Sequence, residues 1–269
     1  MRYALDVQYI GKNYLGSQIQ FVTKYKDGKS CQEEIEPTIQ GVLEKTLSTL
    51  IIGGRNITEN NSRLIKTIFS GRTDKGVNAL GQVIHFDTDK EIVASSFIYH
   101  INEMLPDDIS VTNLRKVPPS FHAQKSAKTR YYRYELINRR YKQAFDGDIL
   151  RVKYDLDLER MQNALNFLLG EHDFSSFKSS GTLNPSKVCC ITRVEVEKQG
   201  DKVFIHIEGN RFLYNMVRTI VGTLLEIEGH KLPVEYMKEV LEAHDRRKAG
   251  QTVSPYGLTL MRVDYPQYS

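Results

Sequence analysis

Residues 70–86 read Ser-Gly-Arg-Thr-Asp-Lys-Gly-Val-Asn-Ala-Leu-Gly-Gln-Val-Ile-His-Phe, a polar loop that runs into an alternating, strand-like segment. Gly71 and Gly76 flank the charged residues, so the backbone there can adopt conformations closed to other residues and approach a ligand closely. Asp74 lies between Arg72 and Lys75. A carboxylate among cations stays ionised and can act as a nucleophile or an acceptor. A hairpin-like turn whose charges face water explains the same spacing, and both interpretations stay open.

Alternation and helical spacing predict mixed secondary structure on both sides of this loop. Residues 3–10 alternate as a strand, and Pro37-Thr38 suits the start of a helix whose buried stripe begins at Ile39. The polar segment 22–36 is expected to be a long loop. Strands are expected at 82–88 and 110–117, with a helix between them at 94–105. This order is compatible with a split β-α-β unit on an antiparallel sheet.

The second half of the chain is expected to contain a similar mixture of strands and helices. Strands are predicted at 130–137, 191–197, 203–208 and 259–265, and helices are predicted after Asp157, over 210–228 and after Pro233. We therefore expect an α+β fold of two similar α/β halves, divided near residue 113. Residues 1–113 would form an N-terminal domain that carries the Asp74 loop, and residues 114–269 a C-terminal domain with a basic and aromatic face.

Bulk composition is that of an ordinary globular protein, with 40% hydrophobic and 26% charged residues among 269. No apolar run is long enough to cross a membrane as a helix. The three cysteines lack C-x-x-C spacing and nearby histidines, which argues against a zinc site and suits a reducing cytoplasm.

Charge is distributed unevenly along a chain whose net charge is only +4. Residues 115–153 carry eleven Lys and Arg side chains against three acidic ones. Six aromatic residues are interleaved with them: Phe121, Tyr131, Tyr132, Tyr134, Tyr141 and Phe145. Cations that meet phosphates and rings that stack on bases are typical of RNA binding. A solvated strand face with tyrosines in the core is the alternative.

The 70–86 stretch resembles the catalytic loop of the TruA family of tRNA pseudouridine synthases, whose pattern is G-R-T-D-x-G-V-x-A. Further matches follow in the family's order: Tyr9-Ile10-Gly11 with Gly16-Ser17-Gln18, 38–44, Phe121-His122-Ala123, 130–134, Asn215-Met216-Val217-Arg218 with Ile220-Val221-Gly222, and Gly257-Leu258. The resemblance covers nearly the whole chain. Two departures stand out, because Ser17 occupies a position where the family often has Trp, and Asn78 one where His is usual.

The resemblance implies an isomerase that converts uridine to pseudouridine in the anticodon stem-loop of tRNA, at positions 38 to 40. It implies Asp74 as the nucleophile, Tyr132 as the ring that stacks on the flipped base, and Arg218 and Arg72 as further substrate-site residues. It also implies two ferredoxin-like halves that share a central, mainly antiparallel sheet, with helices on one side and an RNA-binding cleft. Neither the residues nor the resemblance decides between attack at the ribose C1′ and attack at the uracil C6.

Cofactors and partners follow from the same considerations. A carboxylate nucleophile requires no cofactor, and the family usually works as a cytoplasmic homodimer on tRNA. His85, Asp87 and Asp89 fall on one strand face and raise the alternative of a metal site, but no further ligand occurs at a matching spacing. We therefore expect no metal.

Two other functions are compatible with parts of the pattern. A catalytically inactive tRNA-binding protein or RNA chaperone of the same fold would not need an intact Arg72-Thr73-Asp74 sequence. An aspartyl-nucleophile phosphatase normally requires Mg²⁺ held by further carboxylates beside the nucleophile, whereas this loop offers Arg72 and Lys75.

Overall fold

The computed structural model describes residues 1–26, 29–35, 37–53, 64–179 and 186–266. The chain forms two compact units, which we call the N-terminal unit, Met1–Ala127 with the chain from Tyr265 onward, and the C-terminal unit, Lys128–Asp264. The boundary expected near residue 113 falls inside strand β6 (Ile109–Val117), whereas the units divide between Ala127 and Lys128.

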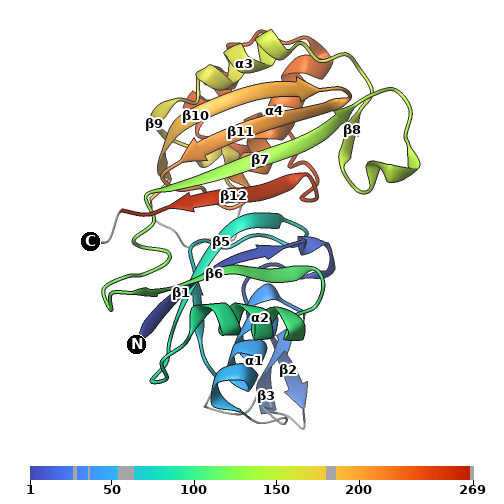
Figure 1. The fold of residues 1–269 in the computed structure, drawn as a ribbon. Helices are drawn as coiled ribbons and strands as arrows, with labels where there is room; N and C mark the ends of the chain where they lie inside the picture. The colour runs from blue at the N-terminus through green and yellow to red at the C-terminus, as the bar shows by residue number, and fades with distance from the viewer. Residues whose placement is uncertain (27–28, 36, 54–63, 180–185, 267–269) are drawn as a thin grey trace. The chain divides into compact units, whose positions relative to one another are not determined.

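An antiparallel sheet in the order β6-β1-β5-β4 forms the centre of the N-terminal unit. Figure 1 labels three of its strands, β1, β5 and β6. Its strands are β1 (Arg2–Tyr9), β4 (Thr67–Phe69), β5 (Asn78–Asp87) and β6. The alternation predicted for β1 is confirmed, because Tyr3, Leu5, Val7 and Tyr9 are all buried. Helices α1 (Ile39–Ile52) and α2 (Ala94–Met104) pack against each other and against this sheet. A short 3₁₀ helix, η1 (Gly11–Asn13), follows β1.

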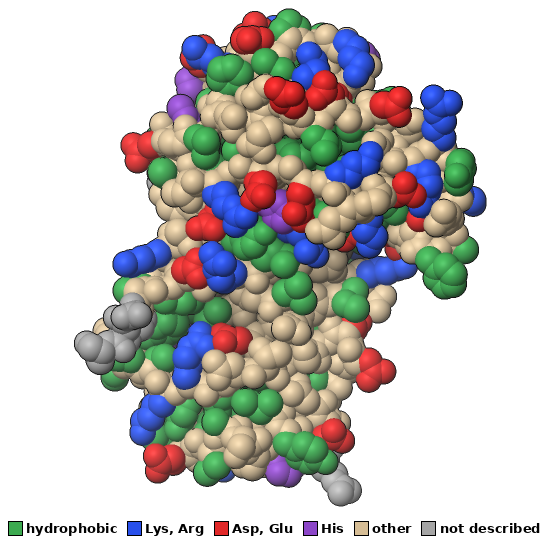
Figure 2. All heavy atoms as spheres, turned by 45° about the horizontal axis from the view of Figure 1, so that its top comes forward, with side chains coloured by type: hydrophobic (Ala, Val, Ile, Leu, Met, Phe, Trp, Pro, Cys, Tyr) green, Lys and Arg blue, Asp and Glu red, His purple; other side chains and the backbone are tan. Residues whose placement is uncertain are grey.

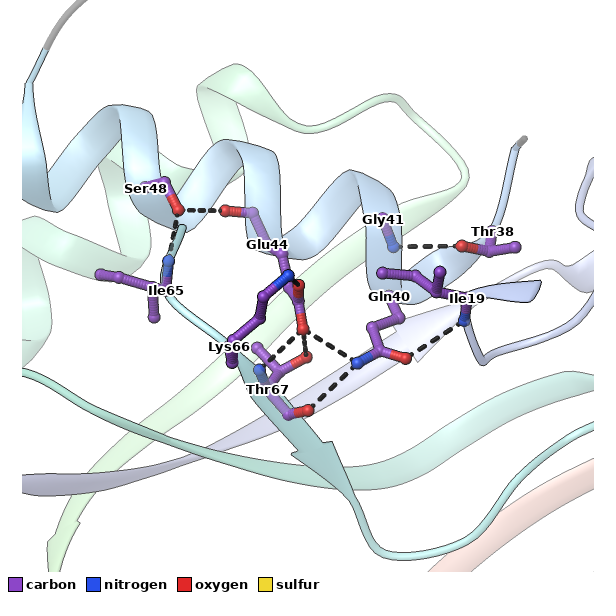
Figure 3. Close-up of polar contacts among 9 residues, drawn as sticks. All are labelled: Ile19, Thr38, Gln40, Gly41, Glu44, Ser48, Ile65, Lys66 and Thr67. Atoms are coloured by element: carbon purple, nitrogen blue, oxygen red, sulfur yellow. Dashed lines mark hydrogen bonds and ion pairs between the residues drawn. The ribbon is translucent and has the colours of Figure 1, made fainter. Parts of the chain in front are cut away.

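Helix α1 begins where the sequence predicted, because the Thr38 side chain accepts a hydrogen bond from the Gly41 N–H at 3.1 Å. A buried carboxylate then ties the helix to β4 (Figure 3). Glu44 accepts bonds from the Thr67 N–H at 2.8 Å and from Lys66 Nζ at 3.0 Å. One turn further on, Ser48 Oγ accepts the Ile65 N–H at 2.8 Å. These contacts hold residues 65–67, at the start of β4, against α1.

The expectation of a long loop over residues 22–36 is wrong. Strands β2 (Gln20–Lys26) and β3 (Lys29–Ile35) form an antiparallel hairpin that pairs from Gln20↔Ile35 to Lys26↔Lys29. The polar composition of the segment obscured its strands, although the sequence Asp27-Gly28 is a strong hairpin signal.

The C-terminal unit also carries an antiparallel sheet, in the order β12-β7-β11-β10-β9, with β8 parallel to the end of β7. Helices α3 and α4 pack on it (Figure 1). The strands are β7 (Thr129–Asn138), β8 (Leu150–Val152), β9 (Gly170–Asp173), β10 (Val188–Gln199), β11 (Lys202–Gly209) and β12 (Leu258–Asp264). The helices are α3 (Leu158–Asn166), α4 (Met216–His230), α5 (Tyr236–Ala243) and the 3₁₀ turns η2 (Ala144–Asp146), η3 (Ser175–Phe177) and η4 (Arg246–Lys248).

Helix α4 begins at Met216, six residues later than the sequence suggested. Asn215 precedes it with φ 62°, a left-handed conformation that Asn tolerates better than most residues and that ends any continuous helix from residue 210. Arg211 therefore lies outside the helix that carries Arg218. Gly222 of α4 has a packing role, because a Cβ atom there would lie 1.7 Å from the Gln251 carbonyl oxygen.

Among the helices of the described residues, none is both long and apolar enough to span a lipid bilayer.

Candidate active site

The Asp74 loop is closed by a tight turn. The Val77 N–H donates to the Asp74 carbonyl oxygen at 3.1 Å, and Gly76 has φ 82° at the third position of the turn. A positive φ at that position is characteristic of a type II turn and favours glycine. The Arg72 and Lys75 side chains are exposed, and Asp74 between them is half-buried. The loop thus presents its charged residues on a backbone of fixed shape.

A second segment, Gly16-Ser17, holds the residue before Asp74. The Thr73 N–H donates to Ser17 Oγ at 2.8 Å, and the Ser17 N–H donates to the Thr73 carbonyl oxygen at 3.0 Å. Gly16 forms an antiparallel bridge with Asp74 itself. It has φ 120°, and a Cβ atom there would lie 2.9 Å from the Thr73 carbonyl oxygen. Only glycine therefore fits at this contact without strain.

A buried polar network supports the loop from the core. Tyr9 OH bonds Thr73 Oγ1 at 2.8 Å, and Gln82 Nε2 donates to Tyr9 OH at 3.3 Å and to the Gly71 carbonyl oxygen at 3.0 Å. Ser70 Oγ completes the network by donating to Gln82 Oε1 at 2.6 Å. Burial raises the pKa of Tyr9 to about 12, so its phenol stays neutral at physiological pH.

The exit of the loop is fixed by Asn78, one of the two departures from the family pattern. Its Oδ1 accepts the Gly11 N–H at 2.9 Å. A Cβ atom on Gly11 would lie 2.1 Å from the Val77 carbonyl oxygen, which explains why a glycine faces the loop here. The sequence indicated Gly11 and Gly16 only as parts of matching motifs. It gave no signal that Tyr9, Ser17 and Gln82 hold the loop, because these residues come together through tertiary contacts.

Tyr132 lies in the C-terminal unit on β7, opposite Ile207 of β11 and Leu260 of β12. Its side chain is 9% exposed, and its ring meets Phe212 edge-on at 5.0 Å between centroids. The ring is therefore held in a fixed orientation at the edge of the core. Its neighbour on the same strand face, Tyr134, is completely buried and donates its hydroxyl to the Ser254 carbonyl oxygen at 2.9 Å. Burial raises the pKa of Tyr134.

Arg218 is the third residue of α4 and is tethered at two atoms. Its Nε donates to the Val253 carbonyl oxygen at 2.8 Å, and its Nη1 donates to Asn215 Oδ1 at 2.6 Å. Asn215 in turn donates its Nδ2 to Ser179 Oγ at 3.0 Å. The guanidinium is thus oriented by its own unit. Arg72 and Asp74 share a loop of the N-terminal unit, whereas Tyr132 and Arg218 belong to the C-terminal unit.

Two members of the trio considered as a metal site are held by other contacts, and the third, Asp89, lies beyond the end of β5. His85 is 2% exposed, and its Nδ1 accepts the Ala123 N–H of the Phe-His-Ala motif at 3.1 Å. Asp87 accepts two bonds from Arg2, at 2.9 and 2.7 Å. Within the described ranges, no three His, Cys, Asp or Glu residues are grouped as metal ligands would be. His85 and Asp87 therefore have structural roles on β5.

The buried His85 predicts a pH-dependent stability. Burial, followed by the charges of Arg2 and His122, lowers the pKa of His85 to about 4, against an ordinary value of 6.5. The unfolded chain therefore binds a proton at His85 more readily than the folded protein does. The contribution of neutral His85 to the free energy of unfolding is present above pH 6.5 and is lost as the pH falls toward 4. Between pH 7 and pH 5 this residue should account for about 2 kcal/mol of the loss in unfolding free energy. Urea unfolding of the parent and of His85→Gln at both pH values measures the effect, and an equal loss in both proteins would contradict it.

The basic stretch 115–153 separates into paired and exposed cations. Arg115 bonds Asp6 at 2.6 Å, Arg133 lies over the Phe204 ring, and Arg139 is paired with both Asp146 and Asp201. The exposed cations are Lys116, Lys125, Lys128, Arg140, Lys142 and Lys153, of which Lys116 also pairs with Glu91 at 3.6 Å. On the face drawn in Figure 2, basic side chains are interspersed with acidic and hydrophobic ones.

Residues 139–149, which we call the arm, connect β7 to β8. The arm is braced by Arg139, whose guanidinium bonds Asp146 inside the arm, and by reciprocal bonds between Gln143 and Asp146. It exposes the rings of Tyr141 and Phe145 beside the cations Arg140 and Lys142. The sequence located this mixture of rings and cations but not the ion pairs that brace it.

Comparison with known proteins identifies the family of this chain. A family model described as tRNA pseudouridine synthase matches residues 164–266. The tRNA pseudouridine synthase A of Colwellia psychrerythraea is 38% identical over 99% of this chain and 95% of its own length. The proteins of that name from Shouchella clausii and Pseudomonas aeruginosa are 39% and 38% identical, over 99% and 98% of this chain and 94% and 86% of theirs. At this identity over nearly the full length, the chain belongs to the tRNA pseudouridine synthase A family, whose members are isomerases.

Proposed function

We propose that this protein converts uridine to pseudouridine in the anticodon stem-loop of tRNA, at positions 38 to 40, with Asp74 as the nucleophile. The assignment of Asp74 as the nucleophile is supported by the hydrogen bonds that hold its loop. Every described polar atom of Thr73 is bonded to Ser17 or Tyr9, so the residue before Asp74 is fixed while Asp74 stays half-exposed. Preorganised groups of this kind are what catalysis requires.

The reaction is an isomerisation that consumes no co-substrate. The carboxylate of Asp74 attacks the ribose C1′ or the uracil C6, the C1′–N1 bond breaks, and C5 of the base bonds to C1′. The bond to Asp74 then breaks, either because C5 displaces the carboxylate from C1′ or because the carboxylate is eliminated from C6, so Asp74 is regenerated. The proton that C5 loses and the proton that N1 gains balance the reaction. An ionised carboxylate is the only nucleophile that either route requires.

Tyr132 and Arg218 are proposed to complete the site from the C-terminal unit. Phe212 contacts the Tyr132 ring edge-on and fixes its orientation. The ring would stack on the uracil once the nucleotide has flipped out of the RNA helix. Arg218 and Arg72 would face Asp74 or the substrate as planar, permanently charged groups. The tethers from Arg218 to Val253 and Asn215 support this role, because they orient the guanidinium before substrate binds.

We also propose that the two units are related ferredoxin-like halves and that the RNA contacts both of them. The support is topological, since each unit contains the order β-α-β-β-α-β along the chain once the β2–β3 hairpin of the first unit and β8, β9 and α5 of the second are set aside. The resulting strand orders, β6-β1-β5-β4 and β12-β7-β11-β10, are equivalent when the strands are numbered within each unit. A homodimer and a cytoplasmic location complete the proposal. The free thiols of Cys189 and Cys190 suit a reducing compartment, and light scattering of the purified protein measures the oligomeric state.

The test of the function is a map of pseudouridine in total tRNA from cells with and without this protein. Pseudouridine at positions 38 to 40 should disappear without the protein and return when the parent chain is supplied. Return with Asp74→Asn, or a map that the protein does not alter, would contradict the proposal.

The arm predicts a salt-dependent part of tRNA binding. Replacing Arg140 and Lys142 together by Gln should flatten the slope of log K against log salt by about 1.5, because two phosphate contacts are lost. Arg139 stays unchanged, since its guanidinium is bonded to Asp146 and Asp201. Filter binding over a series of salt concentrations gives the slope. The matched control, Lys231→Gln with Lys238→Gln near α5, removes the same charge and should leave the slope unchanged; equal slopes in both variants would place the contact elsewhere.

A further inference from the structure

We propose that Ser17 is a positioning residue for Asp74: its hydroxyl and its backbone together set the orientation of the peptide that joins Thr73 to Asp74. The proposal rests on the proposed role of Asp74 as the nucleophile.

Ser17 binds both backbone polar groups of Thr73. The completely buried Ser17 hydroxyl accepts the Thr73 N–H at 2.8 Å and directs its own hydrogen toward the Thr73 carbonyl oxygen at 3.4 Å. The Ser17 N–H donates to the same carbonyl oxygen at 3.0 Å. That carbonyl belongs to the peptide bond whose nitrogen is the Asp74 N. The orientation of this peptide decides where the Asp74 side chain points.

Ser17 is itself anchored to a rigid element. Its carbonyl oxygen accepts the Gln40 N–H at 2.9 Å, and the Gly16 carbonyl oxygen accepts the Ile39 N–H at 3.2 Å. These are the first amides of α1, which the structure caps at Thr38. Ser17 therefore connects the N-terminal end of α1 to the Asp74 loop, although Ser17 and Thr73 are 56 residues apart in sequence.

The role requires a side-chain hydroxyl at this position. The family often has Trp here, and the indole N–H is only a donor, so Trp has no side-chain atom that could accept the Thr73 N–H. An alanine would likewise remove the acceptor, and Thr73, which is 6% exposed, has little access to water as a substitute. The peptide would then shift to find another partner. A displacement of about 1 Å at a reacting group can cost about a hundredfold in rate.

Ser48 supplies a matched control in the same unit. Its hydroxyl is also completely buried and also accepts a backbone N–H, that of Ile65, at 2.8 Å (Figure 3). Ser48→Ala therefore removes an equivalent hydrogen bond from α1 without touching the Asp74 loop. Any loss of stability that the two alanine variants share is separated in this way from an effect on the site.

The experiment compares Ser17→Ala, Ser17→Cys, Ser17→Thr and Ser48→Ala with the parent. Single-turnover pseudouridine formation with excess enzyme gives the rate of the chemical step, filter binding gives the tRNA Kd, and urea unfolding gives stability. Ser17→Ala should lower the single-turnover rate about 10- to 100-fold with a Kd within about twofold of the parent. Ser17→Cys fills the same space with a much weaker acceptor and should lose rate similarly, whereas Ser17→Thr keeps the hydroxyl and should restore most of it. Ser48→Ala should be destabilised to a similar extent and keep the parent rate.

A parent-like rate in folded Ser17→Ala or Ser17→Cys would overturn the proposal, as would an equal loss of rate in Ser48→Ala. Asp74→Asn, assayed alongside, separates this outcome from a failure of the proposed function. If Asp74→Asn is inactive while the Ser17 variants are fully active, only the positioning role fails. If folded Asp74→Asn forms product, the nucleophile assignment fails and the role of Ser17 fails with it.

Discussion

Asp74→Asn should reduce pseudouridine formation below detection. The amide has nearly the size and polarity of the carboxylate but carries no anion, so it cannot attack C1′ or C6. No neighbouring group can replace it, because Arg72 and Lys75 are cations and Thr73 has its hydroxyl bonded to Tyr9 at 2.8 Å. The tRNA Kd should change less than about threefold, because contacts to phosphates and sugars position the RNA independently of the reacting group.

The measurement is a single-turnover assay on a tRNA substrate, with filter binding and circular dichroism of the same preparations. The loop should tolerate the change, since the amide, carbonyl and hydroxyl groups of Thr73 stay bonded to Ser17 and Tyr9. Asp74→Glu, which keeps the charge on a longer side chain, is the matched variant and should retain a trace of activity at most. Substantial product from folded Asp74→Asn would rule out the nucleophile assignment.

Tyr132→Ala should show the second largest effect, a near-complete loss of turnover. Base stacking on an aromatic ring contributes about 1–3 kcal/mol, and its loss would leave the extruded uracil without a support. The variant should also lose stability, because Tyr132 is 9% exposed and packs on Phe212. Truncating a buried aromatic side chain costs about 3–5 kcal/mol. Activity must therefore be compared at a temperature where the variant is folded.

Tyr132→Phe separates the ring from its hydroxyl. It keeps the edge-on contact with Phe212 and should bind tRNA like the parent, so a lower single-turnover rate would assign a chemical role to the hydroxyl. Tyr134→Phe is the control on the same strand face, because it removes only the bond to the Ser254 carbonyl oxygen. That variant should lose about 1 kcal/mol of stability and keep its activity. Full activity in folded Tyr132→Ala would remove Tyr132 from the site.

Local sequence rules were sufficient wherever a few neighbouring residues decide the structure. Thr38 begins α1 because its hydroxyl can accept the Gly41 N–H three residues on. Asp157 begins α3 in the same way, by accepting the Arg160 N–H at 3.1 Å. The alternation of β1 and the hairpin of β10 and β11 also follow from local sequence patterns. The motif around Asp74 was enough to indicate the family.

Contacts between distant residues decided what the sequence could not. Helix α4 begins at Met216 because Asn215 adopts a left-handed conformation, while its side chain bonds Ser179 and Arg218. Such a conformation is set by tertiary partners and leaves no periodic signal. Arg139, one of eleven basic residues in its stretch, pairs with Asp146 and also with Asp201, which lies 62 residues away in sequence but close in space.

The same division holds at the site. The sequence by itself was enough to propose which residues carry the chemistry, because Arg72, Thr73 and Asp74 are contiguous and form a recognisable motif. Only the tertiary structure decided how Asp74 is held. The acceptor of the Thr73 N–H comes from Ser17 and the partner of its hydroxyl from Tyr9, 56 and 64 residues away. A hydrogen bond depends on distance and angle in space, so neither partner could be found until α1 and β1 were packed beside the loop.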